Sequence, residues 1–370
     1  MSIQPFHRAQ KDMLAERPPP ATTTGTLGWL RENLFSNWFN TALTLLALYL
    51  LWTIIPPFID WAFIHADASG STGRECTTEG ACWAWLDQRI DQFLYGFYTA
   101  SEYWRVNLTV ILLIPALLPL LFDGIPCARQ LRYFSLAYPV IAVFLLVGGI
   151  GLEAVPTSSF GGFMLNLAVG LSGIVLSLPV GILLALGRRS NLPVLRILCV
   201  MFIELVRGVP LITLLFTAAI LLPMFLPENW SPDLVIRVIV VVTAFASAYM
   251  AEVIRGGLQA IPKGQYEAAQ AMGLGYWQSM RLIILPQALK ISIPGIVNTF
   301  IGLFKDTTLV FLIGLFDILG IARSLQQNQD WIGKVDAEGF LFTSLFFFIV
   351  CFSMSRYSLN LEKRLDTTNR

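Results

Sequence analysis

The chain has 370 residues, of which 55% are hydrophobic and only 13% are charged. Soluble domains carry about 25% charged residues, so this composition excludes an ordinary soluble domain and predicts an integral membrane protein. The formal net charge of +1 gives no reason to expect a nucleic-acid partner.

The N-terminal part begins with a polar segment, residues 1–38, which includes the run Pro18–Pro20 and predicts a cytoplasmic tail without a packed core. Apolar runs follow that are long enough to cross a membrane, since a spanning helix needs about 20 residues. A polar loop, residues 65–104, separates the first two of them. The three spans expected in this N-terminal extension, residues 39–155, are about 39–63, 106–122 and 135–152.

The C-terminal part, residues 160–360, contains five more expected spans. The apolar run 197–226 is too long for one upright span, because thirty helical residues reach about 45 Å and the hydrocarbon core is about 30 Å thick. We divide it, so that 190–208 lies partly along the cytoplasmic face and 209–226 spans. The predicted fold is therefore all-α with about eight spans, the last five at about 163–187, 209–226, 234–253, 292–317 and 337–357.

The placement of lysine and arginine predicts the orientation, because loops on the cytoplasmic side carry an excess of both. With the N-terminus inside, the cytoplasmic segments hold Arg8, Lys11, Arg17, Arg31, Arg129, Arg132, Arg188, Arg189, Arg196, Arg255, Lys263, Arg281, Lys290, Arg356, Lys363, Arg364 and Arg370. The opposite side holds only Arg74, Arg89, Arg105, Arg323 and Lys334. We therefore expect both termini and the loop 256–290 in the cytoplasm, and the loop 65–104 in the periplasm or exterior.

Few residues support metal or hydrolytic chemistry. Cys76 and Cys82 lie in the outer loop, where a disulfide can form, although two free thiols fit the sequence equally well. The two histidines, His7 and His65, are far apart in sequence, so no Cys/His metal site is expected. The run 170–173 matches the G-x-S-G of intramembrane serine proteases, but neither histidine is placed to act as its base. The chain also lacks the G-x-x-x-x-G-K-S/T phosphate loop, so we expect no ATP binding by that route.

A polar stretch from Glu267 to Pro286 interrupts the apolar runs of the second half and predicts a helix, a turn and a second helix. The alanines that follow Glu267 have high helix propensity and give the first helix a small, smooth face. We expect this helix to start at Gly264, with Glu267 in its first turn, where the helix dipole favours a negative charge.

The turn and the second helix are predicted from glycine and proline. Gly273 and Gly275 are expected to supply the positive φ of a tight turn, which only glycine adopts without a steric cost. Pro286 is expected to bend the second helix towards the next apolar run.

The spacing of this stretch closely resembles the EAA loop of ABC importer permeases. The shared positions are Glu267-Ala268-Ala269, then Gly273, and, after nine intervening residues, Ile283-x-Leu285-Pro286. The resemblance covers about residues 160–360 and implies a type I importer permease core in the last five spans. It further implies that a cytoplasmic ATPase docks on a coupling surface formed by Glu267, Ala268, Ala269, Gly273, Gly275, Leu285 and Pro286.

Two E-x-x-R-G runs place charges near the ends of expected spans. The pairs are Glu204 with Arg207 and Glu252 with Arg255, and the i,i+3 spacing puts acid and base on one helix face. Charge at membrane depth is costly and therefore marks functional candidates. Either each pair satisfies itself at the interface, or the four residues line an inner gate or brace the coupling loop.

Lys305, Asp306 and Thr307 are expected well inside the seventh span. Neighbouring residues on a helix point in different directions, so Lys305 or Asp306 should face a cavity or a partner subunit. The two side chains complement the carboxylate and ammonium groups of an amino acid. The alternative is a structural group with buried polar residues such as Asn298. This stretch and the Glu204 stretch, E-L-V-R-G-V-P-L, resemble permeases of the polar amino acid branch.

The enlarged N-terminal region further resembles the general L-amino acid permease subgroup. That resemblance implies a second homologous permease subunit, an ATPase dimer that binds ATP and Mg in the cytoplasm, and a periplasmic amino-acid-binding protein. It also implies a bacterial inner-membrane location and no enzymatic chemistry or cofactor in this chain. An ion-coupled secondary transporter of small polar solutes is the alternative, because it would also carry intramembrane charges but needs no ATPase.

Overall fold

The computed structural model describes residues 25–365 apart from positions 78, 123, 150 and 228–231. Most of the predicted tail 1–38 lies outside the described residues. The same is true of four basic residues from which the orientation was predicted, Arg8, Lys11, Arg17 and Arg370. The chain divides into two compact units, Met1–Ala66 with Thr78–Ala81 and Asp67–Thr77 with Cys82–Arg370.

The first unit contains the predicted first span. Its helices are α1 Gly25–Asn33 and α2 Trp38–Ile59, and α2 continues into the π-helical turn η1 Asp60–Ile64. The side chain of Asn37 caps α2 by accepting a hydrogen bond from the backbone N–H of Asn40 at 2.8 Å. No residue of α2 is buried within the described chain. A long helix that is apolar on every side suits a lipid environment, in agreement with the predicted span 39–63.

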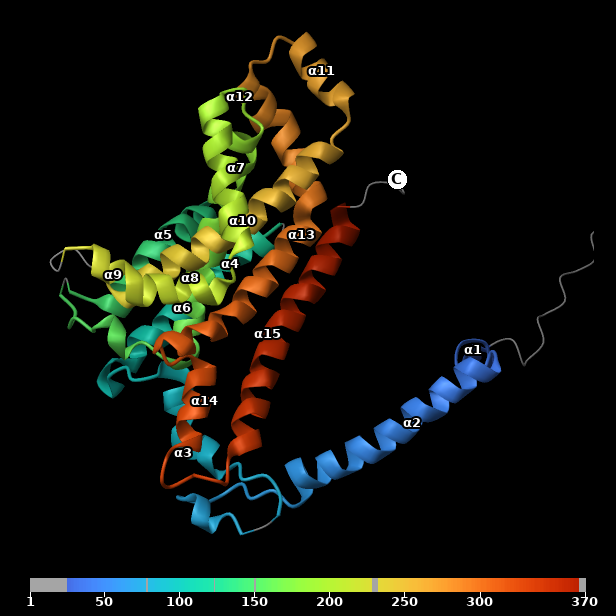
Figure 1. Cartoon of the computed structure of the whole chain (residues 1–370), viewed down its shortest axis with the longest axis vertical. Coiled ribbons are helices and arrows are strands. Elements are labelled where there is room, and N and C mark those ends of the chain that lie inside the picture. The colour runs from blue at the N-terminus through green and yellow to red at the C-terminus, as the bar shows by residue number, and fades with distance from the viewer. Residues whose placement is uncertain (1–24, 78, 123, 150, 228–231, 366–370) are drawn as a thin grey trace, which may run out of the picture. The chain divides into compact units, whose positions relative to one another are not determined.

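The second unit holds the helices that form the core (Figure 1). The elements that precede the core region are η2 Gly73–Glu75, α3 Ala84–Tyr95, η3 Ala100–Glu102, α4 Tyr103–Leu121, α5 Ala128–Val147 and η4 Thr157–Ser159. They are followed by α6 Gly162–Arg188, α7 Pro193–Gly208, α8 Leu211–Phe216, η5 Thr217–Leu221, α9 Leu222–Phe225 and α10 Leu234–Ala260. The last are α11 Lys263–Ala271, α12 Tyr276–Ser279, η7 Met280–Ile284, α13 Leu285–Asp306, η8 Thr307–Ile313, α14 Ile318–Gln326 and α15 Asp336–Leu365.

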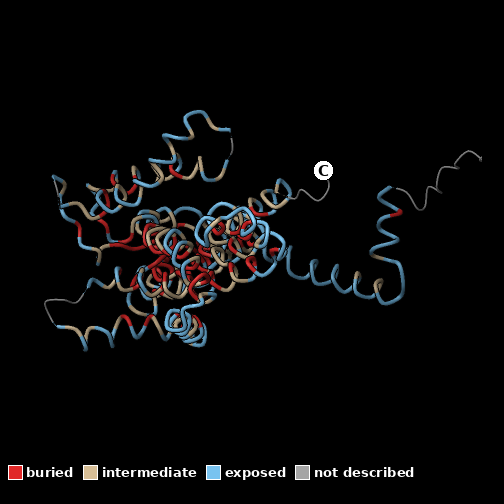
Figure 2. The backbone as a smooth tube through the Cα atoms, turned by 90° about the horizontal axis from the view of Figure 1, so that it is seen from above, coloured by how far each residue is buried: buried red, intermediate tan, exposed pale blue. Residues whose placement is uncertain are grey.

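The packing centre of this unit is α10, which lies between α6 and α13. Figure 2 shows that the buried residues of the second unit lie inside the helix bundle and that exposed residues lie on its outside. Small residues allow the close approach of α6 to α10, because a Cβ added to Gly181 would lie 2.7 Å from the Cβ of Met250. This is how membrane helices associate where lipid provides no hydrophobic drive between them.

The predicted spans are recovered, with one broken segment. The described residues contain seven helices long and apolar enough to cross a membrane, or eight if a bent pair is counted as one span. That pair is α7 with the α8–α9 segment, bent by 103° at Val209–Pro210. The predicted division of 197–226 falls at this break, because Pro210 lacks the N–H that would continue α7.

The sequence predicted a seventh span at about 292–317. The structure differs from that prediction in the bounds of the span and in its helix type. The span begins earlier, since a continuous helical run extends from Tyr276 to Ile313. Its last part, η8, is a 3₁₀ segment that ends at Gly314, where φ is +91°. Lys305 and Asp306 are the last residues of α13 and lie inside this helical run, directly before η8, as predicted for the seventh span.

The part of the loop 65–104 that belongs to the second unit is bonded to residues next to and within α15. Cys76 and Cys82 form a disulfide, with Cα atoms 5.7 Å apart. The Nζ of Lys334 donates to the carbonyl of Cys76 at 3.1 Å, and the N–H of Cys82 donates to the buried carboxylate of Glu338 at 3.1 Å. Residues 82–155 thus belong to the same compact unit as the core, while α2 belongs to the other unit.

A buried polar link joins α6 to α14 at the other end of α6 from Arg188. The Nδ2 of Asn166 donates to Asp317 Oδ2 at 3.2 Å and to Thr307 Oγ1 at 2.9 Å. Asp317 also caps α14 by accepting the N–H of Gly320 at 2.8 Å. Asp317 is fully buried and forms no ion pair with another of the described residues. Burial raises the pKa of Asp317 to about 6, although these hydrogen bonds oppose the change.

We expect this carboxyl group to make the folded chain more stable in mild acid. The pKa is raised in the folded state, so the folded protein binds the proton more tightly, and stability increases as the pH falls from about 6 towards the ordinary value of 3.8. Lowering the pH from 7.5 to 5 should add about 1 kcal/mol through this group, measured as a higher apparent melting temperature in detergent. Asp317→Asn retains a capping side chain and should lack this increment; an equal increment in the variant would contradict the assignment.

Candidate functional site

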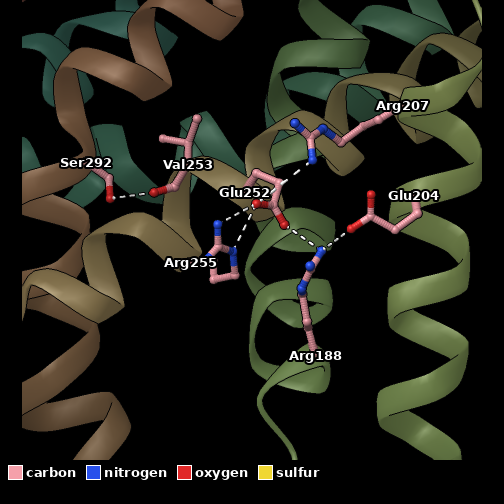
Figure 3. Close-up of polar contacts among 7 residues, drawn as sticks. All are labelled: Arg188, Glu204, Arg207, Glu252, Val253, Arg255 and Ser292. Atoms are coloured by element: carbon pink, nitrogen blue, oxygen red, sulfur yellow. Dashed lines mark hydrogen bonds and ion pairs between the residues drawn. The ribbon is translucent and has the colours of Figure 1, made fainter.

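Five charged side chains from three helices form one network at the ends of α6, α7 and α10 (Figure 3). Arg188 is the last residue of α6. Glu204 and Arg207 come from the last two turns of α7, and Glu252 and Arg255 from the C-terminal third of α10. The five residues are hereafter called the Glu252 network.

Glu252 is the centre of this network. Its Oε1 accepts from Arg188 Nη1 at 2.7 Å, and its Oε2 lies 2.8 Å from Arg255 Nη2. Arg207 approaches Oε2 less closely, at 3.9 Å. Only 16% of the Glu252 side chain is exposed, so its negative charge depends on these three cations.

Arg188 joins α7 to α10. The same Nη1 atom donates to Glu252 Oε1 and to Glu204 Oε1, the latter at 2.8 Å. Next to this junction, Ser292 of α13 donates to the carbonyl of Val253 at 3.3 Å. The ends of α6, α7 and α10 are therefore connected through charged side chains, with α13 bonded alongside.

The prediction that each E-x-x-R pair satisfies itself holds for one pair and is wrong for the other. Glu252 and Arg255 pair at the expected i,i+3 spacing. Glu204 instead pairs with Arg188, and the guanidinium of Arg207 lies 5.4 Å from the ring centre of Tyr249. The local spacing missed Arg188 because this residue comes from another helix. The available signal in the sequence was the position of Arg188 beside Arg189 at the end of an apolar run.

The second group of candidates lies at the end of α13 and the start of η8. Lys305 is exposed, while Thr307 is buried, accepts from Asn166 and donates to the carbonyl of Phe304 at 2.7 Å. Thr307 is therefore part of the polar link to α14. Thirteen residues of helix separate Ser292, beside the Glu252 network, from Lys305, which corresponds to about 20 Å. The candidates thus form two separate groups.

The loop between α10 and α13 contains an exposed short helix. Figure 1 shows α11 and α12 beyond one end of the bundle. Glu267 and Ala268 of α11 are exposed, whereas Ala269 is fully buried. The helix starts at Lys263 after Pro262, so Glu267 is in its second turn. The expected first-turn position of Glu267 is therefore wrong.

The turn after α11 depends on one glycine. Gly273 has φ +73°, as predicted. Gly275 does not require positive φ, since its φ is −65° and it caps α12 in an extended conformation. Pro286 lies in the first turn of α13, directly after the π-helical turn η7, and this wide turn accommodates the missing N–H.

Comparison with known proteins identifies the family to which the sequence is similar. Residues 177–367 match the family described as "Binding-protein-dependent transport system inner membrane component". The chain is 48% identical over 361 residues to the inner membrane amino-acid ABC transporter permease protein YhdY of Escherichia coli strain K12, covering 96% of this chain and 98% of the relative.

Two further similarities were found. The chain is 44% identical to the glutamate/glutamine/aspartate/asparagine transport system permease protein BztC of Rhodobacter capsulatus, covering 100% of both proteins. A solved structure described as "Crystal structure of an amino acid ABC transporter with histidines" is 26% identical, covers 55% of this chain and 92% of its own, and has a TM-score of 0.49.

The geometry predicts that Glu252 matters more than Glu204. Glu252→Gln leaves three arginines with one carboxylate and should lower the free energy of unfolding by about 2–3 kcal/mol. Glu204→Gln removes one contact of a side chain that is 54% exposed and should cost at most about 1 kcal/mol. Apparent melting temperatures in detergent would measure both effects, and uptake by membranes holding equal amounts of each variant should follow the same order. Wild-type uptake by Glu252→Gln would exclude a role in a gate.

Proposed function

The chain belongs to the family of binding-protein-dependent transport system inner membrane components, in the polar amino-acid branch of ABC importer permeases, and from this we propose that it works as one permease subunit of an ATP-driven importer of L-amino acids. ATP and Mg would be bound and ATP hydrolysed by a separate cytoplasmic ATPase dimer. A second homologous permease would complete the membrane pathway, and a periplasmic binding protein would deliver the substrate.

The observation that carries this proposal is the exposed helix α11 with its E-A-A sequence, held between two spans inside the matched region. Nine residues are too few for a helix that is stable alone, so this one depends on its attachments. On its outer side, Gly264, Glu267, Ala268 and Ala271 are all exposed. A face of such small side chains would fit closely into a groove on an ATPase, with Glu267 available to a cation of the partner.

Movement of the docked ATPase would change the conformation of the permease through the cytoplasmic ends of its spans. This change would produce alternating access. When the ATPase dimer closes, the docked loops of the two permeases would be drawn together and the cavity would open to the periplasm. The Glu252 network joins the ends of α6, α7 and α10 and would act as the inner gate. The excess of lysine and arginine supports this orientation, with both termini and α11 in the cytoplasm.

Amino acids are the proposed cargo because the relatives similar over the full length are named as amino-acid permeases. An amino acid carries a carboxylate and an ammonium group. Lys305 is exposed at the end of α13, outside any ion pair of the described residues, and could bind the carboxylate, while Asp306 offers the opposite charge. A charge at this depth is expensive unless it faces a polar pathway.

The direct test is to purify the tagged chain from its native host in mild detergent, identify the proteins that accompany it, and reconstitute them. An ATPase and a second permease should be recovered, and vesicles should take up L-amino acids, each supplied in radiolabelled form, only when ATP is inside. A chain that is purified alone and transports with a proton or sodium gradient without ATP would overturn the proposal in favour of a secondary transporter.

Gly273→Ala should weaken coupling while Gly275→Ala should not. Neither added methyl group would meet an atom closer than 3.8 Å, so steric overlap does not separate the two variants. Only Gly273 has a positive φ, where alanine costs about 1–2 kcal/mol. ATP-driven uptake at matched expression should fall for Gly273→Ala alone. Equal losses would show that contact with the ATPase, rather than turn geometry, sets the sensitivity.

Lys305→Ala should reduce affinity for the amino acid, because it removes the partner of the substrate carboxylate. A loss of about 1–3 kcal/mol corresponds to a rise in KM of roughly fivefold or more. Initial rates of uptake over a range of concentrations would measure this, with Arg323→Ala as a control for loss of a cation. Wild-type KM and rate in Lys305→Ala would remove the residue from the pathway.

A further inference from the structure

Two adjacent arginines at the end of α6 contact different parts of the inner surface. Arg188 bonds to Glu204 and Glu252, as described above. The Nη1 of Arg189 donates to the hydroxyl of Tyr266 at 3.2 Å, and its guanidinium carbon lies 5.7 Å from the centre of the Tyr266 ring. Tyr266 belongs to α11 and directly precedes the exposed Glu267.

Tyr266 is itself held in place. Its hydroxyl donates to the carbonyl of Leu258, near the end of α10, at 3.0 Å. Its ring packs against the apolar cluster that contains Ile254, Leu258 and Ile284. The hydroxyl therefore accepts from Arg189 while donating to α10, so a displacement of α11 would disturb both bonds.

The end of α6 is firmly built. The N–H groups of Arg189 and Ser190 bond to the carbonyls of Leu186 and Gly187, at 3.1 and 3.0 Å. A Cβ on Gly187 would overlap the Sγ of Cys199, so α6 and α7 are in direct contact here. Arg188 and Arg189 are consecutive residues of this one well-held helix end, so a displacement of the end of α6 moves both side chains together.

The hydrogen bonds of Arg188 are sensitive to such a displacement. One nitrogen, Nη1, holds carboxylates from two helices at 2.8 and 2.7 Å. A hydrogen bond weakens steeply as its geometry departs from the optimum, so a small shift of this guanidinium would release α7 or α10.

We propose that Arg188 and Arg189 are positioning residues that link α11 to the Glu252 network. This inference rests on the proposed function, in which α11 receives the ATPase. Movement of α11 would act through Tyr266 on Arg189, and the adjacent Arg188 would change its hold on Glu204 and Glu252. The bond between Gln287 Nε2 and Gln265 Oε1, at 3.1 Å, ties α11 to α13 and does not involve the two arginines.

The test uses the complete reconstituted complex with its ATPase, second permease and binding protein, the last loaded with a mixture of the twenty L-amino acids. The measured quantity is ATP hydrolysis with the loaded binding protein divided by hydrolysis without it. Tyr266→Phe and Arg189→Ala should each lower this ratio by about fivefold or more, as couplings between sites usually do. Arg189→Lys keeps a donor for the tyrosine hydroxyl and should recover much of the ratio.

A double-mutant cycle identifies the route. Arg188→Lys keeps the charge but loses the planar fork, so it should also lower the ratio. If Arg189 acts through Arg188, Tyr266→Phe with Arg188→Lys should be no worse than the more severe single variant. Losses that multiply would overturn the link, as would wild-type ratios in Tyr266→Phe and Arg189→Ala.

Controls separate this link from docking and from the proposed function. Arg196→Ala changes an arginine that forms no ion pair with the described residues, and it should behave as wild type. The ATPase should copurify with Tyr266→Phe and Arg189→Ala at the wild-type ratio; its loss would assign the residues to docking and overturn the link. A wild-type complex whose ATP hydrolysis is not raised by the loaded binding protein would overturn the proposed function and the link with it.

Discussion

The second unit depends on keeping one carboxylate charged where little water reaches it. Glu252 is 16% exposed and is surrounded by three arginines, two of which come from α6 and α7. An ion this far from water is stable only if its partners are held in place. Separating the ends of α6, α7 and α10 therefore costs free energy as long as Glu252 is ionised, because Glu252 then loses cationic partners.

The helix α6 shows how the same requirement is met at its two ends. Asn166 bonds to Asp317 near the start of α6, and Arg188 bonds to Glu252 at its end. Arg188 comes 22 positions after Asn166, a helical rise of about 33 Å, close to the thickness of the hydrocarbon core. Between these polar ends α6 contacts its neighbours through small residues such as Gly173 and Gly181. Polar bonds thus hold the two ends of α6, and close packing of small residues holds its middle against the neighbouring helices.

Sequence reasoning was effective where the signal was local or continuous. Hydropathy located the described spans, the length of 197–226 located the break at Pro210, and Gly273 marked the turn with positive φ. It was less effective where the partner came from another element. The spacing of Glu204 and Arg207 suggested a pair, yet Arg188 of α6 competes for Glu204, and no local pattern contains that information. Likewise, the burial of Asp317 and Thr307 arises only when α6 meets α14.

The short helix α11 illustrates why coupling and stability are difficult to separate in this fold. Its only buried residue is Ala269, so its position depends on a few contacts, chiefly those of Tyr266 and Gln265. A partner that binds α11 can shift the conformation of the chain only if it binds two arrangements of α11 with different affinity. The contacts that could distinguish two arrangements are the same few that hold α11 in place. Under the proposed function, a weakly buried helix beside a strongly charged junction would meet both needs of a coupling element, because it would move at modest cost and its movement would change the bonds of Arg189.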